Sequence, residues 1–187
     1  MATLIADFAW RYPAATWLVP DARRRRPVLQ GCLKILIDHA RRFGYVDVLD
    51  DHSAAAIWLD RTQPIPAPTD SARRLAQVCG DDTEAARLLL DITARCQPPI
   101  PHLQLVALAT DDPDAAATLL AYRHSRLDRL GVASAAYAST QAQLGLLMDA
   151  GYQPTEPVWL PAGPPLWPTL RAAVTPGAAT STRRPAA

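Results

Sequence analysis

Three side chains of this sequence have the types and the spacing for proton chemistry. His102 stands where a proline-rich approach, residues 96–101, enters an expected strand. A histidine there could accept a proton near neutral pH. Tyr137 lies in a second expected strand as a weak acid or a substrate-positioning group, and Ser139 follows two residues later on the same face. The structural alternatives are a packed histidine and a core aromatic ring with its hydroxyl satisfied.

A strand that leads directly into a helix lies between His102 and Tyr137. Apolar residues dominate positions 103–108, as in a mostly buried strand. The following helix is marked at both ends. Thr110, Asp111 or Asp112 can cap its start, Pro113 suits its first position, and a glycine at 131 follows its last residue.

The start of that helix is a candidate anion site, because backbone N–H groups and the helix dipole point toward whatever lies before it. Asp111, Asp112 and Asp114 surround this N-terminus, however, and no glycine lies between Gly80 and Gly131. A phosphate cradle needs glycines for close backbone approach and avoids carboxylates beside it. These residues alone favour an ordinary capped helix.

The helix over 113–130 is expected to have an apolar side and a charged side. The apolar positions are Leu119, Leu120, Leu127 and Leu130. The arginines expected on the other side are Arg123, Arg126 and Arg129. His124 and Asp128 are four residues apart, which predicts a surface pair.

A run of arginines lies in the first turn of another helix, which Asp21 opens and Gly44 ends. Cations there oppose the helix dipole. The run is either a solvated, partly salt-bridged surface or a contact for an anion or RNA. The candidate contact residues, with two more from the end of the helix, are Arg23, Arg24, Arg25, Arg26, Arg41 and Arg42.

The whole chain has the composition of a globular protein. Its 187 residues fit a single domain, expected over 1–174, with a disordered tail over 175–187. A net charge of +1 demands neither a nucleic acid nor an anionic membrane as partner. Cys32, Cys79 and Cys96 match no zinc site or disulfide framework, so we expect no metal and a cytoplasmic location. No apolar run reaches membrane-spanning length.

The remaining elements complete a mixed α/β domain around one sheet. Helices are expected over 2–12, 21–43, 70–78, 82–95 and 140–151. Strands are expected over 45–50 and 54–59 as a hairpin, over 132–139, and in two segments of the C-terminal stretch that begins at Tyr152.

Several segments, in this order and spacing, resemble the Gcn5-related N-acetyltransferase (GNAT) superfamily, in particular the actinobacterial branch that contains puromycin N-acetyltransferase. The resembling segments are ADFAWRYPAATWLVPDARRRR, VDVLDDHSAAAIWL, PPIPHLQLVAL, LLAYRHSRLDRLGVASAAYAS and MDAGYQPTEPVWLPAGPPLWPTLR. The resemblance implies a splayed central sheet, an acetyl-CoA arm between the splayed strands, an amine acceptor, and a tyrosine as general acid.

Three departures from the family pattern qualify this resemblance. DDPDAAATLL replaces the glycine-rich cradle, with Asp112, Asp114 and Ala116 where glycines are expected. Leu147 stands at the position of the family tyrosine and cannot donate a proton. The strand that usually precedes the first helix is missing, which leaves one sheet edge changed or filled by a partner chain. The donor-binding positions that the resemblance implies are Leu108, Ala109, Thr110, Asp112 and Ala116.

These departures predict an N-acyltransferase of GNAT fold that acts on an amine of a small molecule in secondary metabolism. Its donor would be an aminoacyl-tRNA or an acyl carrier protein, with arginines meeting the phosphates. Acetyl-CoA or another acyl-CoA remains open as the donor of an ordinary antibiotic-like N-acetyltransferase. A third interpretation is an inactive binding protein of the same fold. A homodimer is the expected assembly, and no membrane partner is expected.

Overall fold

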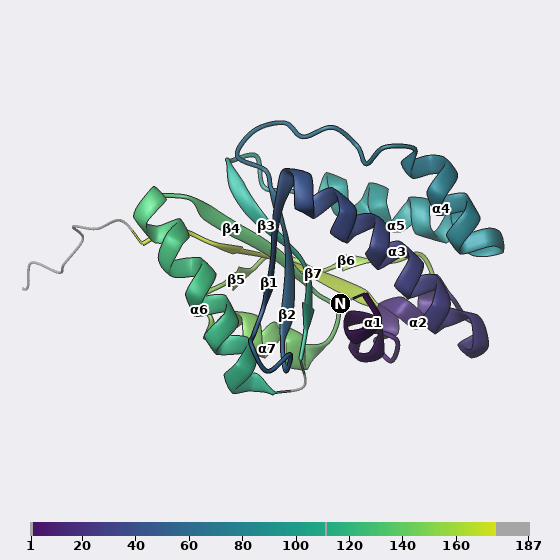
Figure 1. The fold of residues 1–187 in the computed structure, drawn as a ribbon, viewed down its shortest axis with the longest axis horizontal. Helices are drawn as coiled ribbons and strands as arrows, with labels where there is room; N and C mark the ends of the chain where they lie inside the picture. Colours follow the sequence, from purple (N-terminus) through teal and green to yellow (C-terminus); the bar gives the residue numbers. More distant parts are fainter. Residues whose placement is uncertain (1, 111, 175–187) are drawn as a thin grey trace, which may run out of the picture.

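The computed structural model describes residues 2–110 and 112–174, apart from the side chain of Leu4. Asp111 and the expected tail over 175–187 lie outside the described residues. The strands are β1 (Gly44–Val48), β2 (Ala55–Asp60), β3 (His102–Ala109), β4 (Ala133–Ala138), β5 (Gln153–Pro154), β6 (Val158–Trp159) and β7 (Pro165–Arg171). They form a sheet of order β1-β2-β3-β4-β7-β5, with β6 paired to β7 (Figure 1). The mixed α/β class is confirmed.

The helices cover the two faces of this sheet (Figure 1). They are α1 (Ala2–Ala9), α2 (Pro13–Leu18), α3 (Ala22–Phe43), α4 (Ser71–Cys79), the 3-10 turn η1 (Gly80–Asp82), α5 (Thr83–Arg95), α6 (Pro113–Leu130) and α7 (Gln141–Asp149). Helices α6 and α7 pack on one face and α1 to α4 on the other. Because side chains alternate along a strand, Ile57 of β2 enters the core beneath α3 while its neighbour Trp58 enters the core beneath α6.

The N-cap that the sequence predicted at Asp21 is formed, and a further N-cap is formed at Thr140. Asp21 accepts a hydrogen bond from the Arg23 N–H at the start of α3, and Thr140 accepts one from the Gln143 N–H at the start of α7. Gly131 ends α6 with a φ of 66°, a left-handed conformation that favours glycine. The boundaries of these helices therefore follow from local chemistry.

Both ends of the chain differ from the prediction. The expected helix over 2–12 stops at Ala9, and Pro13 opens a second helix, α2, because proline suits a first helical position. Three C-terminal strands form instead of two, and β5 and β6 are only two residues long. Prolines break this segment, since they cannot donate to a ladder. Among the described residues no strand precedes α1, and β1 is an edge strand paired with β2.

The charged side of α6 was predicted only in part. Arg126 and Arg129 are exposed, as expected. Arg123 and His124 are buried, because the helical period places them on the same face as Leu120 and Leu127. Leu130, expected in the core, is 73% exposed in the last turn. His124 does not pair with Asp128, which binds Arg171 through two hydrogen bonds of 2.8 and 2.7 Å. Arg123, His124 and Asp128 each form a hydrogen bond with a strand or loop residue that is distant in sequence.

Within residues 2–110 and 112–174, no helix is both long enough and apolar enough to span a bilayer. The single-domain boundary at residue 174, the homodimer and the cytoplasmic location stay predictions.

Candidate active site

A cavity opens where β3 and β4 separate. The two strands pair in parallel only through His102↔Ala133, Leu103↔Ser134 and Gln104↔Ala135. Beyond Gln104, β3 continues for another five residues without β4 beside it. A cavity of about 240 Å³ lies along this free part of β3. The splay that the family resemblance implied is thus present.

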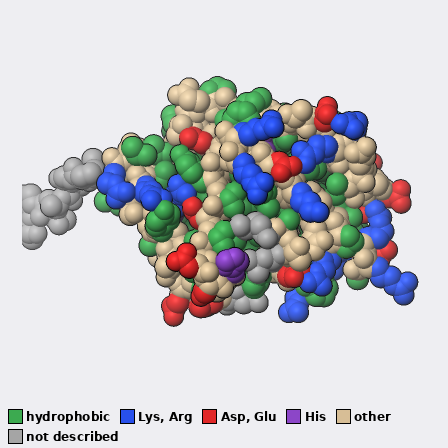
Figure 2. Space-filling model, viewed as in Figure 1, with side chains coloured by type: hydrophobic (Ala, Val, Ile, Leu, Met, Phe, Trp, Pro, Cys, Tyr) green, Lys and Arg blue, Asp and Glu red, His purple; other side chains and the backbone are tan. Residues whose placement is uncertain are grey.

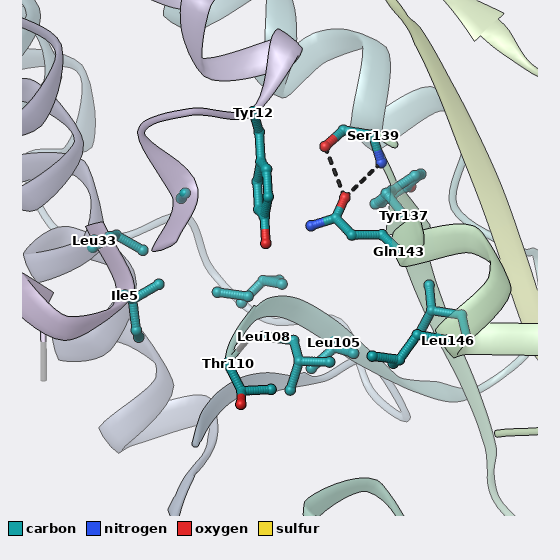
Figure 3. A pocket seen from close by; sticks show the side chains of 14 residues that line it. Ile5, Tyr12, Leu33, Leu105, Leu108, Thr110, Tyr137, Ser139, Gln143 and Leu146 are labelled. Atoms are coloured by element: carbon teal, nitrogen blue, oxygen red, sulfur yellow. Dashed lines mark hydrogen bonds between the residues drawn. The ribbon is translucent and has the colours of Figure 1, made fainter. Parts of the chain in front are cut away.

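The cavity is mostly apolar. Residues of α1, α3 and the helix junction form one wall, the edge of β3 forms the floor, and the end of β4 with α7 forms the other wall (Figure 3). None of the described lining residues is charged. They are Ile5, Ala9, Tyr12, Leu33, Leu105, Val106, Ala107, Leu108, Thr110, Tyr137, Ser139, Gln143, Leu146 and Leu147.

A bulge in β3 lies on the floor of the cavity. In the register with β2, Ile57 faces Ala107 while Trp58 faces Leu105, so Val106 is the extra residue. A bulged residue leaves the regular ladder and redirects its backbone groups. The backbone of Val106 is therefore a candidate donor or acceptor for a molecule in the cavity.

Two polar side chains face each other across the cavity. Figure 3 shows the Tyr12 hydroxyl directed from the α1–α2 junction toward Leu105 and Leu108. On the opposite wall, the amide oxygen of Gln143 accepts hydrogen bonds from the backbone N–H of Ser139 at 2.9 Å and from its hydroxyl at 2.8 Å (Figure 3). The Gln143 amide is thus held in one orientation.

Tyr137 lines the cavity, and its hydroxyl group forms hydrogen bonds with residues that do not line the cavity. The hydroxyl donates to the Thr93 carbonyl at 2.6 Å and accepts from the Gln97 amide at 2.8 Å. Burial raises the pKa of the Tyr137 hydroxyl, so it is neutral at pH 7. Tyr137 can shape the cavity and hold α5 against β4.

His102 does not line the cavity. The side chain is 3% exposed, with Nδ1 2.8 Å from the Ile100 carbonyl oxygen and Nε2 2.9 Å from the Gln97 amide oxygen. Burial lowers the pKa of His102. The structure therefore brings His102 and Tyr137 together through Gln97, and Ser139 lies apart with Gln143. A catalytic role for His102 stays a prediction.

The start of α6 is occupied by its own carboxylate. Asp112 accepts a hydrogen bond from the Asp114 N–H at 2.9 Å, and the Asp112 N–H donates to the Thr110 hydroxyl at 3.0 Å. The first helical residue, Pro113, has no N–H. Two amides that a phosphate would use are thus already satisfied, and a third is missing.

Comparison with solved structures identifies this architecture. A histone acetyltransferase HPA2-related acetyltransferase from Corynebacterium glutamicum is 16% identical, with a TM-score of 0.55 and coverage of 92% of this chain and 91% of that one. A polyamine N-acetyltransferase from Drosophila melanogaster is 14% identical, with a TM-score of 0.60 and coverage of 91% and 94%. The chain has the GNAT fold. No family model and no curated protein matches the sequence.

The donor-binding positions that the GNAT resemblance implied fall into two groups. Leu108 and Thr110 line the cavity. Ala109 and Ala116 are fully buried, and Asp112 caps α6. In this GNAT fold the splay can accept an apolar arm, while the α6 N-terminus offers little to a diphosphate.

Most of the arginine run at the start of α3 is engaged within the chain. Arg24 pairs with Asp82 at 3.0 Å, and Arg26 pairs with Asp7. Arg25 is buried and donates to the Val19 and Pro20 carbonyls. Arg41 and Arg42 are exposed at the far end of the helix, roughly 25 Å away at 1.5 Å per residue. On the face of the molecule that Figure 2 shows, basic side chains are spread out, with acidic side chains among them.

Sequence reasoning missed Tyr12 and Gln143 as site residues. Tyr12 was expected as the last residue of a helix that ends before Pro13, which gave it no role in a site. Gln143 follows Thr140 by three residues, a capping-box spacing, which hides any other role. Leu147, where the family tyrosine is expected, is buried and lines the cavity. Among the described residues no group of three potential metal ligands is found.

Proposed function

We propose that this protein is an N-acyltransferase that moves an activated acyl group to an amine of a small molecule. The observation that carries the proposal is the cavity of about 240 Å³ in the splay between β3 and β4, whose described lining residues are all uncharged. An apolar slot of this kind suits a pantetheine arm and a neutral acyl group. The amine as acceptor is supported by the Drosophila polyamine N-acetyltransferase, whose described reaction forms N-acetylagmatine.

In this proposal the protein does not bind the acyl donor through a diphosphate group. At the α6 N-terminus the Asp114 N–H is bonded to the Asp112 side chain and Pro113 has no N–H, so these two positions offer no amide to an anion. An acyl carrier protein or an aminoacyl-tRNA would present the acyl group from outside, with its phosphates against exposed arginines such as Arg23, Arg41 and Arg42. A role in secondary metabolism rests on the resemblance to the puromycin N-acetyltransferase branch alone.

The residues of the cavity support direct transfer from a thioester. A neutral amine attacks the carbonyl carbon, the C–N bond forms, and the oxyanion is stabilised by donors in the cavity. When the C–S bond breaks, the Tyr12 hydroxyl gives its proton to the thiolate and recovers one from the new ammonium nitrogen. Tyr12 thus takes the acid role that Leu147 cannot fill. Burial in an apolar site favours the neutral amine over its ammonium form.

The test compares three acetyl donors with a panel of small amines: acetyl-CoA, S-acetyl-pantetheine and an acetylated carrier protein. Each charge-assisted phosphate contact contributes about 1.5–3 kcal/mol, so a working diphosphate clamp would favour acetyl-CoA over S-acetyl-pantetheine by more than about a hundredfold in kcat/KM. We expect the two values to agree within about tenfold. The carrier protein should exceed both.

A hundredfold preference for acetyl-CoA would replace this donor assignment with an ordinary acetyl-CoA-dependent N-acetyltransferase. If none of the three acetyl donors is used but an aminoacyl-tRNA added in a further assay is, the aminoacyl-tRNA is the acyl donor of the proposal. If no donor acylates any amine while S-acetyl-pantetheine still binds, the protein is a binding protein of GNAT fold.

A further inference from the structure

The orientation of the Gln143 amide is determined by its partner. Amide oxygen and nitrogen are often interchangeable in a side-chain assignment. Here the backbone N–H of Ser139 lies 2.9 Å from one of these atoms, and an N–H can only donate. That atom is therefore the oxygen, and the Ser139 hydroxyl adds a second hydrogen bond to it at 2.8 Å. The nitrogen must take the other direction.

That direction is the interior of the cavity. Figure 3 shows the Gln143 nitrogen directed away from Ser139 and toward the side of the cavity from which the Tyr12 hydroxyl projects. The cavity that it faces is lined mainly by apolar side chains, among them Leu105, Leu108 and Leu146. A hydrogen bond in such a low-dielectric place is electrostatically stronger than in water.

We propose that Gln143 is a catalytic hydrogen-bond donor that polarises the acyl carbonyl and stabilises the oxyanion formed on it, with Ser139 as its positioning residue. This inference rests on the proposed function and deepens it. A donor that is already oriented costs no reorganisation during the reaction, and removal of one such donor lowers kcat by about 10²–10³. Two hydrogen bonds into the Gln143 oxygen also polarise its N–H groups.

The alternative role for Gln143 is structural, because the residue occupies the third position of α7 behind the Thr140 cap. Glutamate separates the two roles. Gln143→Glu keeps the acceptor for both Ser139 bonds and suits a capping box, but it has no N–H to donate. Gln143→Met loses both functions. Gln141→Glu adds the same charge at an exposed position of the same helix turn and serves as the matched control.

We expect Gln143→Glu to fold with the thermal stability of the unaltered protein and to lose about 10²–10³ in kcat with little change in KM. Gln141→Glu should retain full activity. Ser139→Ala should lose a smaller factor, because its backbone N–H still holds the Gln143 oxygen. Full activity of Gln143→Glu, or a rise in KM alone, would overturn the inference.

A second measurement separates this inference from the proposed function. S-acetonyl-pantetheine with a carbon-13 carbonyl is an inert ketone that places a carbonyl near the acyl position. We expect its resonance to move downfield on binding to the unaltered protein and to Gln141→Glu, but not to Gln143→Glu. If this shift is observed but no acyl transfer is detected, the proposed enzymatic activity is refuted, while the role of Gln143 as a hydrogen-bond donor to the carbonyl is supported. If the resonance does not shift, or if the ketone does not bind, the role of Gln143 as a hydrogen-bond donor is refuted.

Discussion

Tyr12 is the titratable side chain whose hydroxyl projects into the cavity from the helix wall in Figure 3. If it protonates the leaving thiolate, Tyr12→Phe should lower kcat by about 10²-fold and leave donor binding unchanged, since the ring is retained. Steady-state kinetics with a thioester donor measures this effect. Tyr137→Phe is the matched control, because the Tyr137 hydroxyl bonds to Thr93 and Gln97 outside the cavity. Equal losses in the two variants would contradict the assignment.

His124 illustrates how a buried residue connects stability to pH. Its Nε2 lies 3.1 Å from the Tyr152 hydroxyl oxygen, and that oxygen accepts a hydrogen bond from the Ser134 hydroxyl at 2.7 Å. Burial lowers the pKa of His124 to about 4. The unfolded chain therefore binds the proton first as the pH falls, and the free energy of unfolding decreases below pH 6.5.

We expect this group to remove about 3 kcal/mol of stability between pH 6.5 and pH 4, at 1.36 kcal/mol for each unit of pKa difference. Denaturant unfolding at a series of pH values measures the slope. His124→Gln should flatten the slope in this window. His39 and His102, whose pKa values are also lowered by burial, leave a residual slope of the same sign.

At the scale of elements, a buried ion pair joins α6 to the edge strand β1. The Arg123 Nε lies 2.9 Å from an oxygen of Asp47, and the side chains are only 7% and 10% exposed. The guanidinium also stacks 4.1 Å from the ring centre of Tyr45. A charge left alone in such a place costs far more than the pair contributes.

Asp47→Asn should therefore lower the free energy of unfolding by about 3–5 kcal/mol, as measured by denaturant titration. The exposed pair of Arg73 with Asp70 is the control, and Asp70→Asn should change stability by less than about 1 kcal/mol. Replacing Arg123 and Asp47 together by apolar residues should restore much of the loss. Equal small effects of Asp47→Asn and Asp70→Asn would contradict this account.

The N-terminus of α6 offers a test of its own. Asp112→Gly removes a carboxylate and frees the Asp114 N–H, and a glycine cap costs α6 only a few tenths of a kcal/mol. We expect the affinity for acetyl-CoA to rise about fivefold, which corresponds to about 1 kcal/mol of relieved repulsion. Calorimetric titration measures it. Asp112→Asn keeps the cap without the charge, and the affinity for S-acetyl-pantetheine should stay constant in both variants. A drop in acetyl-CoA affinity would contradict the prediction.

At the scale of the whole molecule, both cores share one sheet. Ile57 and Trp58 are neighbours in β2, yet they belong to opposite cores. We therefore expect one cooperative unfolding transition, with coincident far-ultraviolet and near-ultraviolet circular dichroism curves. Ile57→Ala and Trp58→Ala should each shift that single transition, by about 2–5 and 3–5 kcal/mol respectively. Separate transitions for the two probes would show that the cores unfold independently.

The order of the elements was predictable from local patterns. The hairpin of β1 and β2, the caps at Asp112 and Thr140 and the end of α6 at Gly131 all depend on residues within a few positions of one another. The sheet splay was available only through family resemblance, because it depends on how many residues β3 and β4 pair. The end of the first helix before Pro13 was predicted, but helix α2, which has only six residues, was not.

The sequence by itself determined the class of fold, the helix ends and the acidic start of α6, because periodicity, caps and proline act over one or two turns. The tertiary structure alone decided which polar groups meet. Arg123 finds Asp47 across 76 positions, and Cys32 lies 3.7 Å from Cys79 across 47. Tyr12 and Gln143 line one cavity, although the sequence placed Tyr12 at the end of a helix and indicated no role for Gln143. Contacts between residues so distant in sequence depend on how two helical layers pack on a shared sheet, and no short-range sequence pattern encodes that packing.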